Sequence, residues 1–453
     1  MTELADDSKK DVTAVCAAKL RSNPEEQGRS RLPESTKGNM RTFMARSGRL
    51  LAVIALFLGI PACLMAEGEV VDAGASAGVD PGLGVFSRFP LNFSLSVRGG
   101  YDDNVTTGPS GFDRGAAFAS ASLNLSLSLQ TPRTTVSTAT ALGFTYYSGG
   151  FNTTEPNLNL PITITHKISP RLQIGATILM TYQQEPDFQH DAGSYQRIGN
   201  YFFTQDNLHA DFIWAPRFST VTTYSILAVQ YDDMAAGLFQ DRVENTIGNQ
   251  FRFLLWPTTN LVGEYRFGVV SYSHISRDST TQTLLAGVDH QFSPRLTAGF
   301  RAGAEFRDYE DTGEEDSPHF EANVGYRFGK DTSASWTISY GLEEGNVGST
   351  GTRESFRTGL VANRNLTARL GANLSLFYNH DDYSEGVSLA PGAPPVPLPG
   401  FVEDSFDITL SLRYAMTRYL GVDLGYTHTE VSSDVMFRDY SRNSVYGGFT
   451  VSF

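Results

Sequence analysis

Charged side chains occupy alternate positions within long segments whose intervening positions are apolar. Arg301 and Glu305, for example, alternate with Phe300 and with alanines. Because the side chains of a β-strand point in turn to two opposite faces, such charges gather on one face. Charged groups that line a water-filled passage select among ions and polar solutes, which is the chemistry we predict for them. The inward, pore-lining candidates are Arg98, Arg252, Glu264, Arg266, Arg301, Glu305, Glu321, Arg327, Arg357 and Arg413.

The same charges also allow a structural interpretation. Both signs fall on neighbouring predicted strands, so ion pairs across a wet interior could brace the wall without selecting a solute. The sequence leaves both interpretations open.

Three short acidic runs end or follow alternating segments: Tyr101-Asp102-Asp103-Asn104, Tyr231-Asp232-Asp233 and His380-Asp381-Asp382-Tyr383. Carboxylate and amide oxygens bind Ca²⁺, but these runs lack the regular ligand spacing of a dedicated calcium loop. We therefore predict solvated outer loops, and neither a metal site nor a cofactor. The residues of this acidic cluster are Asp102, Asp103, Asn104, Asp232, Asp233, Asp381 and Asp382.

Enzymatic activity is not predicted. His274, His290, His380 and His428 are present, but no local motif connects any of them to a nucleophile. The net charge of −14 argues against a nucleic-acid-binding protein, which would carry a basic face.

Long strands must position these residues. Leu91–Arg98 and Ala119–Leu129 alternate apolar and polar residues without interruption. A strand that crosses a membrane needs about 9–11 residues for the hydrocarbon core alone. The predicted strands are 91–101, 119–129, 134–148, 157–168, 172–184, 199–214, 218–232, 243–256, 260–273, 281–292, 296–309, 319–328, 332–344, 353–363, 367–382, 404–416, 418–430 and 439–453.

Short turns join the strands in pairs, and longer loops join the pairs. Proline presets the φ angle of a tight turn, and short turns opposite longer loops are typical of transmembrane barrels. The predicted short turns contain Pro132, Pro170, Pro216, Pro257, Pro294, Lys330, Asn363-Arg364-Asn365 and Arg418. Tyrosines close to the loops are predicted to form an outer girdle at headgroup level. They are Tyr101, Tyr146, Tyr147, Tyr182, Tyr231, Tyr272, Tyr309, Tyr378 and Tyr383.

The pattern predicts an all-β protein, a transmembrane antiparallel up-and-down β-barrel of about 18 strands, with roughly 16 as the lower limit. Hydrocarbon offers no partner to the N–H and C=O groups of an edge strand, so the last strand must pair with the first. An interior of this width holds water. The loop Leu389–Gly400 or residues 67–89 could occlude it.

The chain divides into four predicted parts. They are a non-native or disordered leader (residues 1–43), a signal peptide (44–66), a short flexible periplasmic arm (67–89) and the barrel (90–453). In the signal peptide, Arg46 and Arg49 precede an apolar run, and cleavage is expected after Ala66. Translation is expected to start at Met44 or Met40, and lipidation of Cys63 is left open.

With Tyr101–Asn104, the Ser293–Leu296 turn and the terminal Phe453, the chain resembles outer-membrane β-barrel porins of Gram-negative bacteria. It resembles in particular those encoded beside exopolysaccharide-export genes. The resemblance implies an outer-membrane location, contact with lipid and lipopolysaccharide, and no nucleic-acid partner. It also implies that Phe453 is an assembly signal for the barrel-assembly machinery.

The leading functional hypothesis is a porin-like channel for passive diffusion of small polar solutes. Two alternatives stay open. One is a component of exopolysaccharide secretion that contacts polysaccharide-export proteins, and the other is a structural or adhesive barrel that acts through its surface loops.

Overall fold

The computed structural model describes residues 91–453 apart from 152, 311–312, 330, 348–351 and 389–395. The predicted leader, signal peptide and arm, with Cys63, lie outside the described residues, as does most of the proline-rich loop. Among the described residues, no helix has the length and apolar character needed to cross a membrane.

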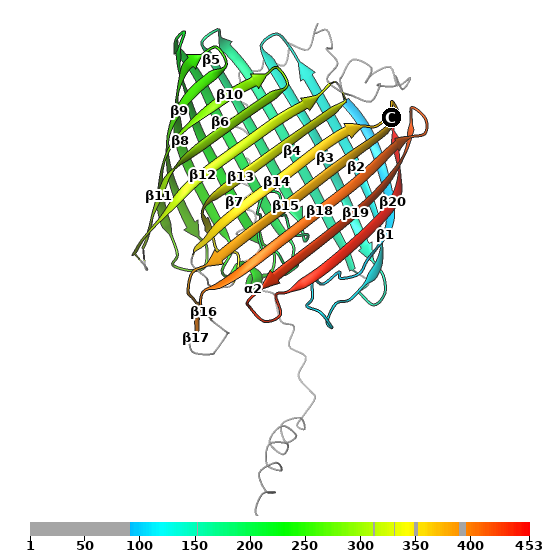
Figure 1. Cartoon of the computed structure of the whole chain (residues 1–453). Coiled ribbons are helices and arrows are strands. Elements are labelled where there is room, and N and C mark those ends of the chain that lie inside the picture. Colours follow the sequence, from blue (N-terminus) through cyan, green and yellow to red (C-terminus); the bar gives the residue numbers. More distant parts are fainter. Residues whose placement is uncertain (1–90, 152, 311–312, 330, 348–351, 389–395) are drawn as a thin grey trace, which may run out of the picture. The chain divides into compact units, whose positions relative to one another are not determined.

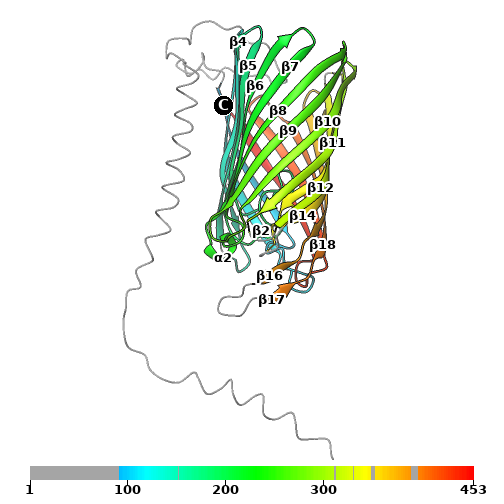
Figure 2. The ribbon, with the colours of Figure 1, turned by 90° about the vertical axis from the view of Figure 1, so that its left-hand side faces the viewer.

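Eighteen antiparallel strands form one closed sheet, in which each strand pairs with its neighbours along the chain (Figure 1). This confirms the predicted fold class. Two small elements, the helix α2 (Met234–Gly237) and the hairpin of β16 (Gly386–Ser388) and β17 (Val396–Leu398), lie at the end opposite the C-terminus (Figures 1 and 2). The barrel strands are β1 (Leu91–Asp102), β2 (Ala116–Gln130), β3 (Thr134–Tyr147), β4 (Thr153–Ser169), β5 (Leu172–Gln183), β6 (Tyr201–Ala215), β7 (Phe218–Tyr231), β8 (Arg242–Trp256), β9 (Thr259–Tyr272), β10 (Ser279–Ser293), β11 (Leu296–Tyr309), β12 (Gly313–Phe328), β13 (Thr332–Glu344), β14 (Thr352–Asn365), β15 (Leu370–Tyr383), β18 (Phe401–Ala415), β19 (Leu420–Ser433) and β20 (Tyr440–Ser452).

The first and last strands close the barrel. β1 pairs with β20 in a register that runs from Ser94 opposite Ser452 to Asp102 opposite Ser444. The backbone N–H of Phe453 donates to the carbonyl of Phe93 and extends the pairing by one bond. The predicted contact between the two ends of the sheet is therefore present.

The inner and outer faces follow from ion pairs that pass over whole strands. Arg266 on β9 contacts Glu321 on β12 (Nη1–Oε1, 2.6 Å), although β10 and β11 lie between them. Only the concave side of a barrel brings such side chains together. Arg301 lies on the same face, so Phe300 points outward; its exposed fraction is 53%, and that of Leu410 is 43%.

Hydroxyl side chains stabilise the short turns. The Ser293 Oγ atom accepts hydrogen bonds from the backbone N–H groups of Arg295 and Leu296. The Thr367 Oγ1 atom accepts in the same way from the N–H groups of Arg369 and Leu370. The predicted turn at residues 363–365 is wrong, because β14 continues to Asn365. Thr367-Ala368-Arg369-Leu370 is the turn instead, and it repeats the pattern of Ser293–Leu296.

Two strands begin at least four residues earlier than predicted, and in each the pairing runs through a proline, Pro156 in β4 and Pro318 in β12. β4 begins at Thr153 rather than 157, and β12 begins at Gly313 rather than 319. Pro161 pairs with Leu179 of β5, while the ladder between β3 and β4 is interrupted at this position. A proline without an N–H is thus accommodated where the pairing on one side is already broken.

The predicted outer girdle of tyrosines is wrong for more than half of its members. Tyr101 and Tyr146 are exposed on the outer wall. The buried members are Tyr147, Tyr231, Tyr272, Tyr309 and Tyr383. Tyr231 faces the interior, where its hydroxyl accepts the N–H of Ser194 at 2.9 Å. Closeness to a strand end places a tyrosine at the depth of the headgroups, but the alternation of the strand decides whether its ring faces the lipid or the interior.

The closing seam predicts the effect of one substitution. A Cβ at Gly448 of β20 would lie 2.4 Å from the Val97 carbonyl oxygen and 2.9 Å from the Arg98 Cα atom. Gly448→Val should therefore destabilise the folded barrel by about 1–3 kcal/mol. Urea unfolding followed by gel mobility of unheated samples measures this loss. Gly263→Val in β9 is the control, since a Cβ there meets no atom within 4 Å; an equal loss in both variants would contradict the prediction.

Candidate pore constriction

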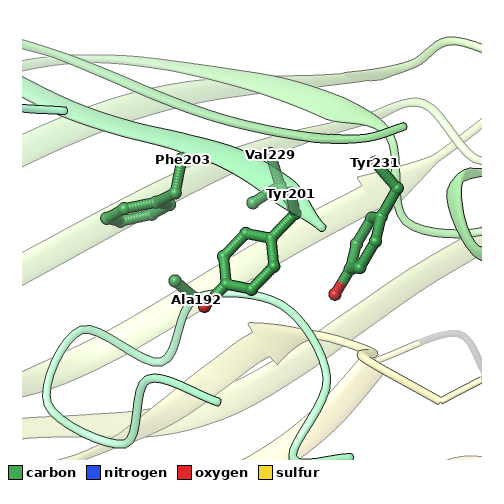
Figure 3. Close-up of a cluster of buried hydrophobic side chains, with 5 residues drawn as sticks. All are labelled: Ala192, Tyr201, Phe203, Val229 and Tyr231. Carbon is green, nitrogen blue, oxygen red and sulfur yellow. The ribbon is translucent and has the colours of Figure 1, made fainter. Parts of the chain in front are cut away.

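The loop between β5 and β6, residues 184–200, crosses the interior of the barrel. Near one wall its Ala192 packs with Tyr201 and Tyr231 in a buried cluster (Figure 3). Its Phe188 and Tyr195 are buried in a second cluster. The wall residues of that cluster are Val431 of β19 and Tyr440 of β20. We refer to residues 184–200 as the constriction loop, because a segment held at two distant walls must narrow the passage between them.

The constriction loop turns back on itself at Asp187–Gly193. The Asp187 carboxylate accepts the backbone N–H groups of Gln189 and His190, each at 3.0 Å. Asp191 (φ 55°) and Gly193 (φ 72°) adopt the left-handed backbone region that a tight reversal needs. The reversal is a local feature of polar and glycine residues, but its inward direction is set by contacts with the walls.

Arg353 on β14 holds the constriction loop from the far wall. Its guanidinium donates to Asp381 of β15 at 2.7 Å and to the Tyr195 hydroxyl at 2.9 Å, and it pairs with Asp191. The Arg353 side chain is 2% exposed. Removing one partner of a buried ion pair leaves an uncompensated charge and costs about 3–5 kcal/mol. Arg353 is therefore the main anchor of the loop.

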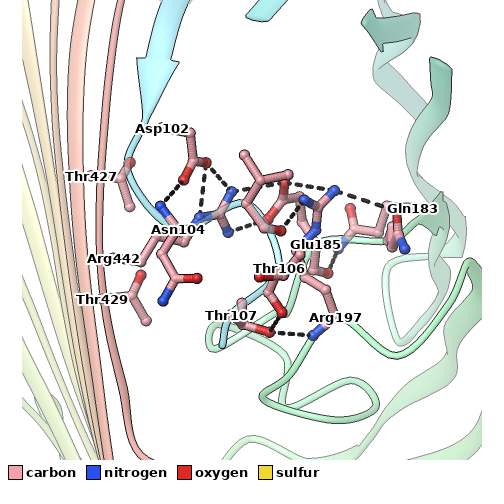
Figure 4. Close-up of polar contacts among 12 residues, drawn as sticks. Asp102, Asn104, Thr106, Thr107, Gln183, Glu185, Arg197, Thr427, Thr429 and Arg442 are labelled. Atoms are coloured by element: carbon pink, nitrogen blue, oxygen red, sulfur yellow. Dashed lines mark hydrogen bonds and ion pairs between the residues drawn. The ribbon is translucent and has the colours of Figure 1, made fainter. Parts of the chain in front are cut away.

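A second anchor lies at the closing seam (Figure 4). Arg442 of β20 pairs with Asp102 of β1 (Nε–Oδ2, 2.9 Å) and with Glu185 of the constriction loop (Nη1–Oε2, 2.6 Å). Arg197, at the other end of the loop, pairs with Glu155 of β4 and lies 3.5 Å from Glu185. One arginine thus connects the first strand, the last strand and the loop.

A third contact involves the loop between β19 and β20. Arg438 pairs with Glu403 of β18 through two bonds of 2.7 and 2.8 Å and reaches Gln196 at 3.4 Å. The Tyr440 hydroxyl donates to the Tyr195 carbonyl at 2.6 Å. The wall and the loop between β19 and β20 therefore contact both a backbone carbonyl and a side-chain amide of the constriction loop.

The electrostatics favour ionised carboxylates in the constriction loop. Burial acts to raise the pKa of Asp191, but the charges of Arg353 and Arg357 outweigh it and hold this pKa below its usual value. In the same way, desolvation acts to raise the pKa of Glu185, and Arg442 and Arg197 together lower it. Both carboxylates carry their charge at neutral pH.

Half of the predicted pore-lining residues form one polar network on β9, β11 and β12. They are Glu264, Arg266, Arg301, Glu305 and Glu321. His319, which the sequence analysis missed, bridges Glu305 (2.9 Å) and Glu321 (3.1 Å). The sequence did contain a signal for His319, because it lies two residues before Glu321 and therefore on the same face of the strand. A role of this network in selecting solutes stays a prediction.

The other half lie apart from this network. They are Arg98, Arg252, Arg327, Arg357 and Arg413. Arg357 contacts the constriction loop through the carbonyl of Phe188 at 3.4 Å. Arg98 lies over a tyrosine ring of β20, whereas Arg252 and Arg413 contact nearby wall residues. The structure therefore distributes the predicted charges over the wall instead of gathering them into one ring.

The acidic cluster is not a single cluster. Asp102 and Asp381 are buried and ion-paired, so the prediction of solvated loops is wrong for them. Asn104 is also buried, and Asp103 accepts the N–H of Asn443 at 2.6 Å. Exposed members are Asp232, Asp233 and Asp382. No group of His, Cys, Asp or Glu among the described residues could hold a metal ion.

Two cavities with mixed polar and apolar linings lie along the inner wall. One, of about 770 Å³, lies between His190 of the constriction loop and the wall of β5–β9, and Glu343 also lines it. The other, of about 640 Å³, includes Asp289 and Asn323 and reaches the short turn between β8 and β9. Amide, hydroxyl and charged groups line both together with apolar side chains, so both spaces suit water and solutes that carry polar groups.

A family profile matches the barrel. The family described as "Putative beta-barrel porin 2" matches residues 84–453. The chain belongs to this family. It is an outer-membrane β-barrel porin, which confirms the predicted location and class. No curated protein matches the sequence.

Several solved structures are similar to this chain at low sequence identity. Pseudomonas aeruginosa OccK2 (OpdF) is 11% identical, with 80% of this chain and 98% of that chain covered and a TM-score of 0.40. Acinetobacter baumannii OccAB4 is 11% identical, with 80% and 98% covered and a TM-score of 0.41. The siderophore receptor PirA from Acinetobacter baumannii is 8% identical, with 81% of each chain covered and a TM-score of 0.40. Similarity at this level does not indicate which solute passes through the barrel.

Loss of the main anchor should release the constriction loop of the porin. Arg353→Met leaves Asp381 without its arginine and leaves Asp191 with only the longer contact to Arg357, at 3.7 Å. We therefore expect trypsin to cut after Arg197 about tenfold faster or more, since loss of a buried ion pair costs several kcal/mol. Fragment analysis on gels measures the rate. Arg98→Met removes another inner-wall arginine that does not touch the loop, and it should leave the rate unchanged. Equal rates for both variants would show that Arg353 is not an anchor.

The anchors also predict a pH dependence. The folded-state pKa of Asp191 is lowered, so its stabilisation is complete above the unfolded-state pKa of about 4 and is lost as the pH falls through the folded value. A nitroxide label at Gln189→Cys, in a chain with Cys16 and Cys63 replaced by serine, should stay immobile from pH 8 to pH 5. Its mobility should rise only below about pH 4. Release between pH 5 and pH 6 would contradict these ion pairs.

Proposed function

We propose that this porin is a passive channel for small polar solutes, and that the constriction loop sets the size of its passage. The observation that carries the proposal is the pair of cavities along the inner wall, one beside the loop at His190 and the other reaching the short turn between β8 and β9. Solutes would follow the wall of β8–β13, since the loop is fixed against the walls of β6, β7, β14 and β18–β20.

The polar network favours neutral or weakly charged solutes over one strongly selected ion. Arg301 lies between Asp289 (3.3 Å) and Glu264 (3.4 Å), and Arg266 lies between Glu264 and Glu321. Charges that are matched on the wall leave a small net field in the passage. Charged rings of one sign, which select ions strongly, would require unmatched groups.

We also propose that the porin acts without catalysis. Each of three wall histidines has a structural partner: His290 bonds to Thr259, His380 to Asp404 and His428 to Asn443. These pairs involve no serine nucleophile, which a hydrolase of the Ser–His type would need.

Ion currents in planar bilayers test the channel. The wild type should give discrete ohmic steps, and Tyr195→Ala should raise the step size by about twofold or more because a looser loop widens the pore. Tyr195 is suited to this test because the substitution removes both the hydroxyl that contacts Arg353 and the buried ring that packs with Phe188 and Tyr440. Tyr446→Ala, at an inner-wall tyrosine outside the loop, is the control.

Folded wild-type barrels that carry no current would overturn the proposal of a passive channel. Co-purification of such barrels with polysaccharide or with polysaccharide-export proteins would then support the secretion alternative. Assembly by the barrel-assembly machinery through Phe453 is a separate proposal, tested by the amount of folded protein in cells when Phe453 is replaced by serine.

A further inference from the structure

Two loops meet at the end of the barrel that carries the long loops. One is the β7–β8 loop (residues 232–241), which contains α2, and the other follows β13. The Gln240 Nε2 atom donates to the Asn346 carbonyl at 2.8 Å. Because β9–β12 lie between β8 and β13 and neighbouring strands are about 4.8 Å apart, this contact spans roughly 20 Å of wall. Both loops therefore extend over the interior to meet.

Polar side chains fill the space between this contact and the wall. Glu344, at the end of β13, pairs with Arg307 of β11 at 2.7 Å and accepts the Tyr272 hydroxyl of β9. Arg277, between β9 and β10, donates to the Gly345 carbonyl at 3.3 Å. Glu344 and Arg307 are 3% and 6% exposed. The loop ends of β8–β13 are therefore covered on the interior side.

The constriction loop continues the same cover. Ala236 of α2 packs against the buried cluster that contains Ala192 of the constriction loop. Arg353, which pairs with Asp191, also donates to the Glu344 carbonyl at 3.2 Å. The β7–β8 loop, the constriction loop and the segment after β13 are thus joined by contacts around the passage.

The 770 Å³ cavity lies next to this cover. Glu343 and Glu244 both line the cavity. Glu343 directly precedes Glu344, and Glu244 follows Gln240 by four residues. A solute in the cavity must therefore displace part of the cover to leave the barrel at this end.

The contact between Gln240 and Asn346 is incompletely satisfied. Among the described residues, the Oε1 atom of Gln240 and the Nδ2 atom of Asn346 are both buried without a hydrogen-bond partner. A buried polar group without a partner is costly, and water satisfies both groups once the contact opens. Breaking this contact therefore costs less than breaking the ion pair of Glu344 with Arg307.

We propose that the β7–β8 loop is a gate that opens at the contact between Gln240 and Asn346 to let solutes pass. This gate rests on the proposed passive channel. Both ends of the loop are fixed. The Tyr182 hydroxyl donates to Asp232, and the Asp241 carboxylate accepts the backbone N–H of the inward-facing tyrosine at the end of β7 at 2.8 Å. The segment between these ends carries α2 and Gln240, so it can move without disturbing the barrel.

Bilayer currents of Gln240→Glu test the opening of the gate. An ionised glutamate has the size of glutamine but cannot donate to the Asn346 carbonyl, so the closed form loses its hydrogen bond. We expect the ratio of open to closed time to rise about fivefold or more, the usual effect of losing one hydrogen bond. Gln230→Glu is the control, because Gln230 precedes the inward-facing Tyr231 on β7 and lies on the outer face. It should leave the ratio unchanged.

A cross-link tests the closed form. Gln240→Cys with Asn346→Cys, in a chain with Cys16 and Cys63 replaced by serine, should form an internal link with a short bismaleimide. The linked channel should carry about fivefold less current or lower, because the gate then stays over the passage. Each single cysteine variant treated with the same reagent is the control for its bulk. Gel mobility of unheated samples verifies that all variants fold.

The outcomes separate the gate from the channel. Absence of the internal link, a linked channel with the wild-type current, or equal ratios for Gln240→Glu and Gln230→Glu would each overturn the gate. Folded wild-type barrels without current would overturn the channel on which the gate rests.

Discussion

The need to pair every backbone N–H and C=O group in hydrocarbon is the constraint on which the rest of the structure depends. It forces β20 to meet β1, and the meeting places Arg442 beside Asp102 on the inner face. The same arginine reaches Glu185 of the constriction loop. Closure of the wall and position of the loop are therefore linked through one side chain, so the loop adopts its place only in a barrel whose ends have met.

Charge placement follows from the same constraint. Once the outer face is apolar, arginines and carboxylates are directed inward, where each must find a partner because burial of a lone charge is costly. Arg353 finds Asp381 on the next strand and Asp191 on a distant loop. The ion pairs hold the constriction loop and also cancel much of the charge on the wall. The same contacts therefore anchor the loop and keep the net field in the passage small.

The fold was largely predictable from sequence because the period of two extends through strands of twelve residues or more. The predicted limits were wrong beside Pro156, beside Pro318 and at the run Asn363–Asn365, since each suggests a turn locally while the ladder continues through it. The inward course of residues 184–200 was not predictable. Its causes are contacts such as Tyr195 with Arg353, which are far apart in sequence, and the only local signal was the presence of Phe188 and Tyr195 in a polar loop.

The position of the constriction loop inside the barrel is tested most directly by its contact with the loop between β19 and β20. The Gln196 amide donates to the Phe437 carbonyl at 3.1 Å, although the two residues are far apart in sequence. A chain with Gln196→Cys and Phe437→Cys as its only cysteines should therefore form an internal cross-link with a short bismaleimide in intact outer membranes. A compact species of altered gel mobility is the result that we predict. Full labelling of both cysteines as separate sites, with no link between them, would place the loop outside the passage and contradict the account.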